Sequence, residues 1–363
     1  MTDRLIASDP VFTVAGQRVP DLARDCLALS VEETTAGLRT LTAHFLAVAP
    51  RRRPNDDVVE YLDGRTLSFG SELSVSLGPP GNERVVFAGS VSALEATFDE
   101  GDTPHVTVFA EDALMALRMT RRSRTYGQVS DADLARRIAA DHGLSADADA
   151  AGPTYPLVQQ VNESDLAFVR ARAALLGAEV WVTGRTLHFA TRDRRRGPEL
   201  RLAQGRDLLT VAVRADLAHQ RSAVRVSGYD ARGRDRIDAE ADGAVVTAEV
   251  PAGRTGPAVL AGTVGPRLDQ LTRMVPLAEA EGRSWAAARL RARARRFVTA
   301  VGTSRGTPEL TVGSRITLTG VGRPFDGDGY YTTRVRHTFQ RGAGGLRSHF
   351  EAERATVNAE DGR

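Results

Sequence analysis

Alternating apolar and polar residues dominate the first 110 residues of the chain. Four segments show this near period-two pattern, at residues 25–33, 38–48, 71–78 and 86–98. Such alternation is typical of β-strands that bury one face, and turn signals such as G-P-P-G-N separate the segments. Because no helical pattern lies between them, the segments predict an antiparallel barrel or sandwich.

The pattern changes to helical spacing near residue 111. Residues 111–119 and 130–144 carry apolar side chains three and four positions apart, and the second segment begins with Ser130 as a predicted N-cap. A run of small residues at 145–154 predicts a linker. We therefore expect a helical, hairpin-bearing insert over residues 111–195, closed by the polar run R-D-R-R-R-G-P.

Strand-like alternation returns after residue 200. A Gly- and Pro-rich stretch then extends to about residue 275, and the alanine-rich segment 284–297 predicts a helix. The predicted strands of this region are residues 208–214, 222–229, 314–320, 329–339 and 346–353.

The two β regions resemble each other in sequence. G-S-E-L-S-V-S-L-G at 70–78 aligns with G-S-R-I-T-L-T-G at 313–320. Further along both regions, with a two-residue change of offset, the positions that match are Phe98 with Phe339 and Phe109 with Phe350. Chance similarity between alternating hairpins is the alternative explanation. The matches occur in the same order in both regions, which favours an internal duplication.

These patterns predict an α+β, mainly β fold, in which two similar antiparallel β-barrels flank the helical insert. The predicted domains are a first barrel at 1–110, the insert at 111–195, a second barrel with an inserted loop region and helix at 196–355, and a tail at 356–363. Two similar barrels in one chain provide internal pseudo-symmetry, which is useful in an assembly.

Composition adds few constraints. All 48 basic residues are arginine, and the 46 acids leave a net charge of only +2. Nucleic-acid binders usually concentrate basic charge on one surface, so we expect no nucleic-acid recognition. The single cysteine, Cys26, excludes an internal disulfide and a cysteine-based zinc site, and the first ten residues hold no signal-peptide pattern. No apolar run is long enough to cross a bilayer, so we expect a cytoplasmic protein without stable membrane insertion.

The sequence offers little catalytic chemistry. The F-D-G-D-G run at 325–329 resembles half of a calcium loop, but the residues further on do not supply its ligand set. Glu32 and Glu33 are neighbours on a predicted strand and therefore point to opposite faces. The arginine-rich helix near residue 290 predicts a solvated or subunit-facing surface, with nucleic-acid contact as the alternative. We expect no enzyme activity, no metal and no cofactor.

One helical segment, V-N-E-S-D-L-A-F-V-R-A-R-A-A-L-L-G at 161–177, has signals at both ends. Asn162 is its predicted N-cap, which places Glu163 and Asp165 in the first turn, where they oppose the positive end of the helix dipole. Gly177 is the predicted left-handed stop. Its apolar positions lie on two sides, with Phe168 and Leu175 opposite the main stripe, which predicts a helix held between two surfaces.

The same stretch carries a family resemblance. Its signature positions resemble a segment of phage late control protein D and of VgrG-type hub proteins; they are Gln160, Asn162, Glu163, Ser164, Asp165, Phe168 and Gly177. The C-terminal run, with G-T-P-E-L-T-V-G-S-R-I-T-L-T-G-V-G and F-D-G-D-G-Y-Y-T-T-R-V-R-H-T-F, is similar to that family too, and the resemblance spans roughly residues 5–353.

The resemblance implies a trimeric baseplate hub with two tube-type barrels per chain. Such a hub joins the hexameric inner tube to the trimeric central spike of a contractile phage tail or phage-tail-like injection system. Its expected partners are two further copies of itself, a separate spike protein, the inner tube protein and other baseplate proteins. The alternatives are a delivered cell-wall hydrolase and a receptor- or glycan-binding tail protein.

Overall fold

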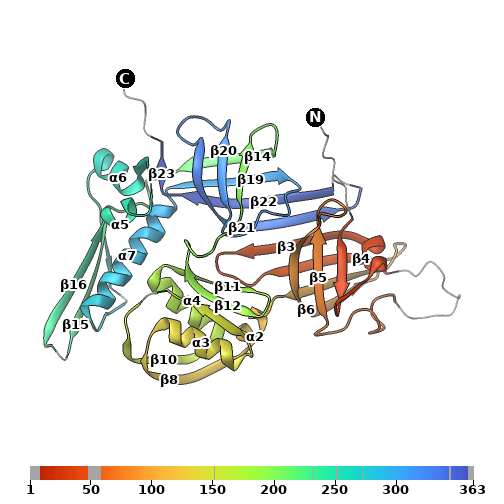
Figure 1. The fold of residues 1–363 in the computed structure, drawn as a ribbon, viewed down its shortest axis with the longest axis horizontal. Coiled ribbons are helices and arrows are strands. Elements are labelled where there is room, and N and C mark those ends of the chain that lie inside the picture. Colours follow the sequence, from red (N-terminus) through yellow and green to blue (C-terminus); the bar gives the residue numbers. More distant parts are fainter. Residues whose placement is uncertain are drawn as a thin grey trace.

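The computed structural model describes residues 9–47, 59–150, 152–231, 233–250, 252–272, 274–342 and 345–358 of the chain. The fold is mainly β, with one large and largely antiparallel sheet and all the described helices except α1 gathered in two insertions (Figure 1). This confirms the predicted α+β, mainly β class. None of the helices in these ranges is long and apolar enough to cross a membrane.

The first half of the large sheet comes from the N-terminal part of the chain. Its strands follow the spatial order β3-β4-β7-β6-β5-β1-β2. These elements are β1 (Val11–Val14), β2 (Gln17–Arg18), β3 (Cys26–Thr34), β4 (Thr40–Leu46), β5 (Glu72–Leu77), β6 (Arg84–Thr97), β7 (His105–Glu111) and the short helix α1 (Pro20–Asp25). Apolar residues on one face form a buried cluster that includes Phe12, Phe45 and Phe87.

The second half repeats this arrangement. Its elements are β13 (Glu199–Ala203), β14 (Leu208–Ala215), β19 (Val298–Arg305), β20 (Arg315–Thr319), β21 (Gly327–Gln340) and β22 (Gly345–Arg354). The order β14-β19-β22-β21-β20 has the same chain sequence as β3-β4-β7-β6-β5. We call these two sets of five strands the first and the second repeat. Each repeat packs its own buried cluster.

The two repeats are joined edge to edge. Strand β21 pairs antiparallel with β3, from Arg334 opposite Thr34 to Gln340 opposite Ala28. The red and blue halves of Figure 1 therefore share one continuous sheet. Among the described residues the pairings do not close either repeat into a ring, so the two expected barrels are present as two segments of an open sheet.

The residue-by-residue correspondence between the two repeats follows from a row of directly opposite residues that crosses four strands of each repeat. In the first repeat the row is Leu29, Ala43, Val108 and Leu94, across β3, β4, β7 and β6. In the second repeat it is Val211, Gly302, Phe350 and Val335, across β14, β19, β22 and β21. Both long strands also carry a bulge, and the hydroxyls of Ser92 and Thr333 there donate to the facing strand at 3.2 Å.

This match corrects part of the sequence alignment. Phe350 corresponds to Val108, whereas the sequence alignment paired Phe350 with Phe109. The second hairpin is one residue longer between Val335 and Phe350 than the first is between Leu94 and Val108. Because alternate residues face opposite sides of a sheet, this one-residue difference places Phe109 on the opposite face.

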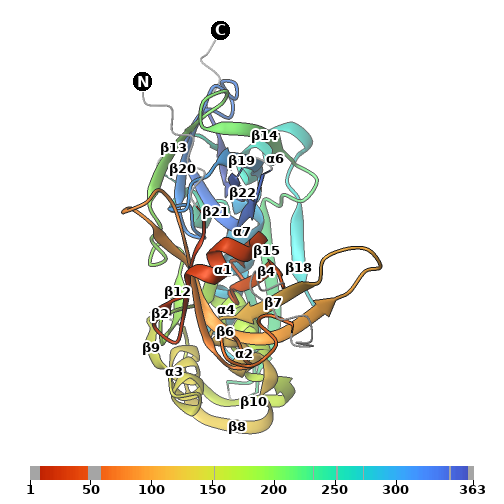
Figure 2. The ribbon, with the colours of Figure 1, turned by 90° about the vertical axis from the view of Figure 1, so that its right-hand side faces the viewer.

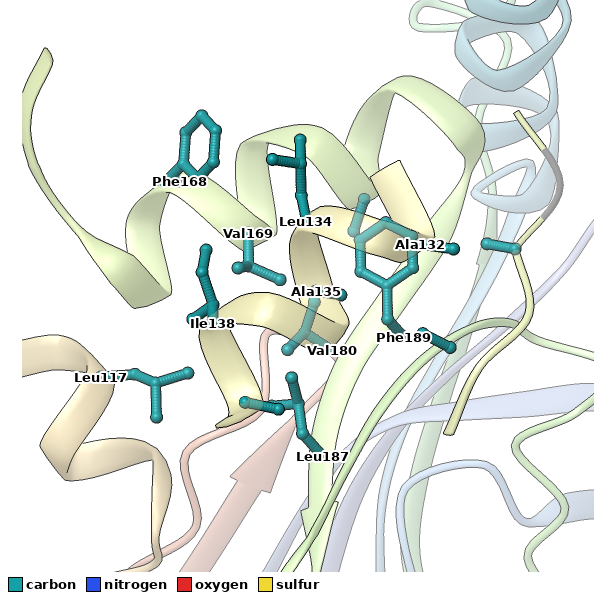
Figure 3. Packing of buried hydrophobic residues seen from close by; sticks show 14 of the residues in the cluster. Leu117, Ala132, Leu134, Ala135, Ile138, Phe168, Val169, Val180, Leu187 and Phe189 are labelled. Carbon is teal, nitrogen blue, oxygen red and sulfur yellow. The ribbon is translucent and has the colours of Figure 1, made fainter. Parts of the chain in front are cut away.

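The insert after the first repeat has its own core. Its elements are α2 (Leu114–Met119), β8 (Arg121–Val129), α3 (Asp131–Asp141), β9 (Ser145–Ala148), β10 (Tyr155–Ser164), α4 (Asp165–Leu176), β11 (Ala178–Thr183) and β12 (Thr186–Thr191). Figure 3 shows Leu134, Ala135 and Ile138 of α3 packed among Val169 of α4 and Val180 of β11. Part of the expected linker at 145–154 is strand β9, which pairs in parallel with β12.

A second insertion separates β14 from β19. It contains β15 (Ala223–Asp230), β16 (Asp235–Asp242), α5 (Ala244–Thr247), β17 (Arg254–Thr255), α6 (Gly256–Val264), β18 (Leu268–Leu271) and α7 (Glu279–Arg295). Helix α7 covers β15 and β16 through Trp285, Ala286 and Leu290 (Figure 1). The expected tail begins with a short strand, β23 (Thr356–Val357), because its backbone pairs with β17; residues 359–363 lie outside the described residues.

Candidate functional site

The signature segment begins its helix later than predicted. The N-cap is Ser164, whose hydroxyl accepts a hydrogen bond from the Ala167 backbone N–H at 3.1 Å. The predicted N-cap, Asn162, lies in strand β10 with a positive φ of 45°, beside a register shift in the pairing with β8. The ladder with β8 holds the backbone extended through Ser164, so the helix starts at Asp165. Gly177, at φ 66°, ends the helix as predicted.

Asp165 is the centre of a buried polar cluster. Its carboxylate accepts hydrogen bonds from Gln160 at 2.8 Å, His142 at 2.8 Å and Arg122 at 2.9 Å. The Asp165 side chain is fully buried. Asp165 and its three partners come from four segments, namely β8, the C-terminal end of α3, β10 and α4. We call Asp165, Gln160, His142 and Arg122 the carboxylate cluster. It ties four segments of the insert to one point.

The carboxylate cluster favours an ionised Asp165. Burial alone raises the pKa of a carboxyl group, but the hydrogen bonds from Gln160, His142 and Arg122 outweigh it and hold the pKa of Asp165 below its usual value. A carboxylate that already accepts three hydrogen bonds is a poor general base. The geometry therefore assigns Asp165 a structural role.

The remaining signature residues divide between structure and surface. Phe168 is buried in the insert's core and stacks on Tyr126, with ring centroids 5.8 Å apart. Leu175 packs against the α7 cluster, so α4 is indeed held between two surfaces. Glu163 is partly exposed on β10, outside the first helical turn that was predicted for it.

The phenylalanines of the predicted duplication differ in exposure. Phe339 and Phe350 are buried, at 4% and 2% exposure, whereas Phe98 is 63% exposed. Phe109 is intermediate and lies on the open face of β7. Phe339 belongs to the core cluster of the first repeat, because β21 lies directly beside β3.

A second polar cluster joins the insert to both repeats, and the sequence did not predict it. Arg195 is 4% exposed and forms ion pairs with Glu33 of β3 at 2.5 Å and with Glu179 of β11 at 2.9 Å. Its guanidinium also lies over the Trp181 ring, 4.7 Å from the ring centroid. One arginine thus links the first repeat to the insert.

The second repeat completes this cluster. The Tyr331 hydroxyl of β21 donates to Glu179 at 2.8 Å, and Arg192 pairs with Glu179 at 3.1 Å and with Glu353 of β22 at 2.5 Å. Burial, together with the neighbouring Glu179 carboxylate, raises the pKa of Tyr331, so the phenol stays protonated and remains a donor. We call Arg195, Arg192, Glu33, Glu179, Tyr331 and Glu353 the junction cluster.

The sequence contained a weak signal for the junction cluster. Arg192 and Arg195 belong to the polar run at 192–198, which was predicted only to close the insert. Three arginines in a row give no indication of which one is buried; Arg194 and Arg196 are exposed. Only the tertiary contacts identify Arg195 as the buried member.

A cavity of about 890 Å³ lies where α4, α7 and the second repeat meet. Charged side chains line it, among them Arg170, Arg289, Arg334 and Glu351. Glu351 is paired with Arg334 at 2.8 Å. In the described ranges, no group of three His, Cys, Asp or Glu residues could hold a metal ion. The cavity therefore presents charges of both signs, and the described residues place no metal-binding group there.

Two strand edges of the large sheet are open in the described part of the chain. Strand β6 pairs with β5 only through residues up to Ser90, and Gly70 and Ser71 bond the Val91 backbone, so residues 92–97 have β7 on one side and no strand on the other. Strand β14 pairs with β19 on one side only. Unpaired edges are sites at which another strand can add.

Comparison with solved structures places this fold among tail proteins. A 43 kDa tail protein of prophage MuSo2 from Shewanella oneidensis aligns with a TM-score of 0.65 and 11% identity, covering 96% of this chain and 98% of that chain. A tail protein from Neisseria meningitidis aligns with a TM-score of 0.62 and 13% identity, covering 98% of this chain and 97% of that one.

A type VI secretion component has a similar fold. The Escherichia coli protein, described as structurally similar to the T4 bacteriophage tail proteins gp27 and gp5, aligns with a TM-score of 0.52 and 14% identity. The alignment covers 96% of this chain and 77% of that one. At these identities the likeness shows a shared fold. No curated protein matches the sequence.

A family model matches most of the chain. The model is described as the Alg8 N-terminal domain and matches residues 54–341, which include most of the first repeat, both insertions and most of the second repeat. The resemblance to late control protein D remains a prediction beside this match. The chain belongs to the Alg8 N-terminal domain family.

Proposed function

We propose that this protein is a structural hub in the baseplate of a contractile phage tail or a phage-tail-like injection system. The observation that carries the proposal is the repeat of one strand order, β3-β4-β7-β6-β5 and β14-β19-β22-β21-β20, within a continuous sheet. Three such chains present six similar units to a hexameric inner tube while keeping threefold symmetry toward a trimeric spike. A chain with this duplication is suited to the change of symmetry.

The descriptions of proteins with this fold support the proposal. They include a prophage tail protein, a further tail protein, a type VI secretion component and a complex that contains VgrG. The proposed partners are two further copies of this chain, a separate spike protein, the inner tube protein and other baseplate proteins. The site of action is the assembled virion or particle, after synthesis in the cytoplasm. The domain boundaries predicted from the sequence are part of this proposal.

We propose no catalytic role. Glu163 is partly exposed, and the other acid of the signature segment, Asp165, is occupied by Arg122, His142 and Gln160. A delivered cell-wall hydrolase predicts lysis that Glu163→Gln abolishes. We expect the purified chain to show no lysis, with or without that substitution.

Mass measurement of the assembled complex tests the hub. The chain is purified alone and together with candidate spike and tube proteins encoded beside its gene, and each complex is weighed by native mass spectrometry. We expect three copies of this chain per complex, with the spike bound to the trimer. A complex that holds one or two copies contradicts the proposal.

A further inference from the structure

The internal contact between the repeats defines a complete strand junction. On one side is β21, with Arg336 opposite Glu32 and Phe339 opposite Leu29 of β3. Glu32 pairs with Arg334 at 2.9 Å and lies 4.0 Å from Arg336, and Phe339 is 4% exposed within the first repeat's core. The junction thus combines backbone pairing, two arginines around one acid and one apolar anchor.

Within the described residues, each chain also carries both sides of this junction without a paired strand. Strand β6 is the counterpart of β21, and β14 is the counterpart of β3, by strand order and by the matched row of facing residues. The open half of β6 is the part that corresponds to the segment of β21 paired with β3. Strand β14 is open on the side that corresponds to the side of β3 facing β21.

We propose that β6 of one copy pairs antiparallel with β14 of the next copy, in the register of the internal β21–β3 junction. In the matched row, Leu94 corresponds to Val335, and Val211 corresponds to Leu29. We call the β21–β3 pairing, applied to the counterpart residues of β6 and β14, the transferred register. It places Glu95 opposite Arg214, Thr97 opposite Ala212 and Phe98 opposite Val211. The partner is a second copy of this chain, and main-chain hydrogen bonds supply the pairing.

The charges of the two edges agree with this register. Internally a basic residue of β21, Arg336, faces an acid of β3, Glu32. At the transferred position an acid, Glu95, faces a base, Arg214, so the pair is kept with its signs exchanged. The match between repeats was set by backbone pairing and not by charge, so this complementarity is an independent observation. A shift by one residue places Glu95 opposite Val213 or Ala215 and loses it.

The apolar anchor agrees as well. Phe98 is 63% exposed, although its counterpart Phe339 is 4% exposed. In the transferred register Phe98 reaches Val211, and Val211 and Val213 pack against the core of the second repeat. The junction covers a large aromatic side chain that a single chain leaves in water, which contributes favourable burial.

This contact uses different surfaces on the two copies. Such head-to-tail contacts form a ring when the rotation closes and a filament when it does not. The register follows from the internal junction alone, whereas closure at three copies rests on the proposed function. The two statements can therefore fail separately.

Cross-linking between single-cysteine variants tests the register. Chains with Thr97→Cys are mixed with chains carrying Ala212→Cys under mild oxidation, and disulfide-linked heterodimers are measured on non-reducing gels. Facing residues of antiparallel strands lie within the Cα range that a disulfide requires. Native Cys26 is a poor competitor because burial raises its thiol pKa to about 12. The control mixture pairs Thr97→Cys with Thr210→Cys, an exposed position of β14 that is two residues out of register.

We expect heterodimers from the 97–212 mixture and few from the control. Equal yields, or no heterodimer at the highest soluble concentration, overturn the register. A chain that carries both Thr97→Cys and Ala212→Cys then counts the copies: a closed three-chain product supports the trimer. A ladder of longer products supports the junction and contradicts closure at three. A trimer without the 97–212 link contradicts the register alone.

A charge exchange provides a second measurement. Glu95→Arg and Arg214→Glu each place like charges opposite one another, and we expect each to weaken self-association roughly 2- to 10-fold in sedimentation at low salt. The double variant restores the pair, so its association should return toward that of the native chain. Asp235→Arg, on the exposed β15–β16 hairpin, is the control. Failure of the double variant to recover overturns the proposed Glu95–Arg214 contact.

Discussion

At the scale of single residues, the insert depends on Asp165. This carboxylate accepts hydrogen bonds from three different segments while its side chain is fully buried. A buried charge is tolerated only when its partners compensate for lost solvation. Glu163, two positions away, has partial exposure and no such set of partners. The two acids that a sequence places together therefore serve different purposes.

We expect Asp165→Asn to destabilise the protein by about 3 kcal/mol, because it removes the buried charge at 2.9 Å from Arg122 and leaves this guanidinium with the more distant Asp141, at 3.8 Å. Denaturant unfolding monitored by circular dichroism measures the change. Glu163→Gln is the matched control and should alter stability by less than about 0.5 kcal/mol. An equal loss in both variants contradicts the structural role of Asp165.

The same residue gives a pH dependence. Because the folded-state pKa of Asp165 is lowered, its stabilising contribution is complete above the ordinary carboxyl pKa of 3.8 and is lost as the pH falls through the folded value. The native chain should therefore lose stability faster than Asp165→Asn below about pH 4. Parallel acid titrations of unfolding free energy for the two proteins measure this difference.

At the scale of elements, three parts of the chain meet through the segment that follows β12. Arg195 and Arg192 lie in this segment and reach acids on β3, β11 and β22. Both repeats and the insert thus share one set of buried ion pairs. Buried pairs contribute little net stability compared with an apolar core, but breaking one leaves uncompensated charge.

We predict that Arg195→Met lowers stability by about 3–5 kcal/mol, because Glu33 and Glu179 each lose a buried partner. Scanning calorimetry should show the insert unfolding apart from the repeats, where the native chain unfolds as one unit. Arg196→Met, at the exposed neighbouring position, is the control. A single unshifted transition in Arg195→Met shows that the junction cluster does not couple the parts.

At the scale of the whole molecule, the two repeats are alike in topology and unlike in surroundings. His44 with Thr107 and Thr303 with His349 form the same contact at matched positions with the residues exchanged, at 3.0 and 2.9 Å. The view in Figure 2, turned from Figure 1, shows the first repeat's β6 and β7 reaching away from the second repeat. The β21–β3 junction is formed inside the chain, whereas the corresponding edges of β6 and β14 face outward.

Substitution of the matched phenylalanines should expose this difference. Phe339→Ser removes a buried aromatic side chain and should destabilise the isolated chain by about 3–5 kcal/mol. Phe98→Ser, at the exposed counterpart, should change monomer stability by less than about 0.5 kcal/mol. Thermal unfolding at a concentration too low for association measures both. A large loss in Phe98→Ser contradicts its exposure in the single chain.

Periodicity alone determined the element types and the fold class, because local alternation depends only on which face of each strand is buried. It located the strands at 25–33 and 71–78, which the structure has as β3 and β5, whereas alanine content indicated the helix near 290, which the structure has as α7. Short elements such as α1 and β9 escaped it, since a few residues carry no measurable period. The helix start at 161–165 was misplaced because the ladder with β8 overrides the local capping preference.

The sequence by itself determined a duplicated, mainly β chain with a helical insert, since patterning and repeated motifs are local properties. Only the tertiary structure decided which residues of that chain are coupled. It selected Arg195 over its neighbours, assembled the carboxylate cluster from residues up to 43 positions apart, and set the hairpin match one residue away from the sequence alignment. It also left β6 and β14 open while pairing β21 with β3. The physical reason is that burial, charge pairing and strand register depend on which segments meet, and no local pattern encodes that.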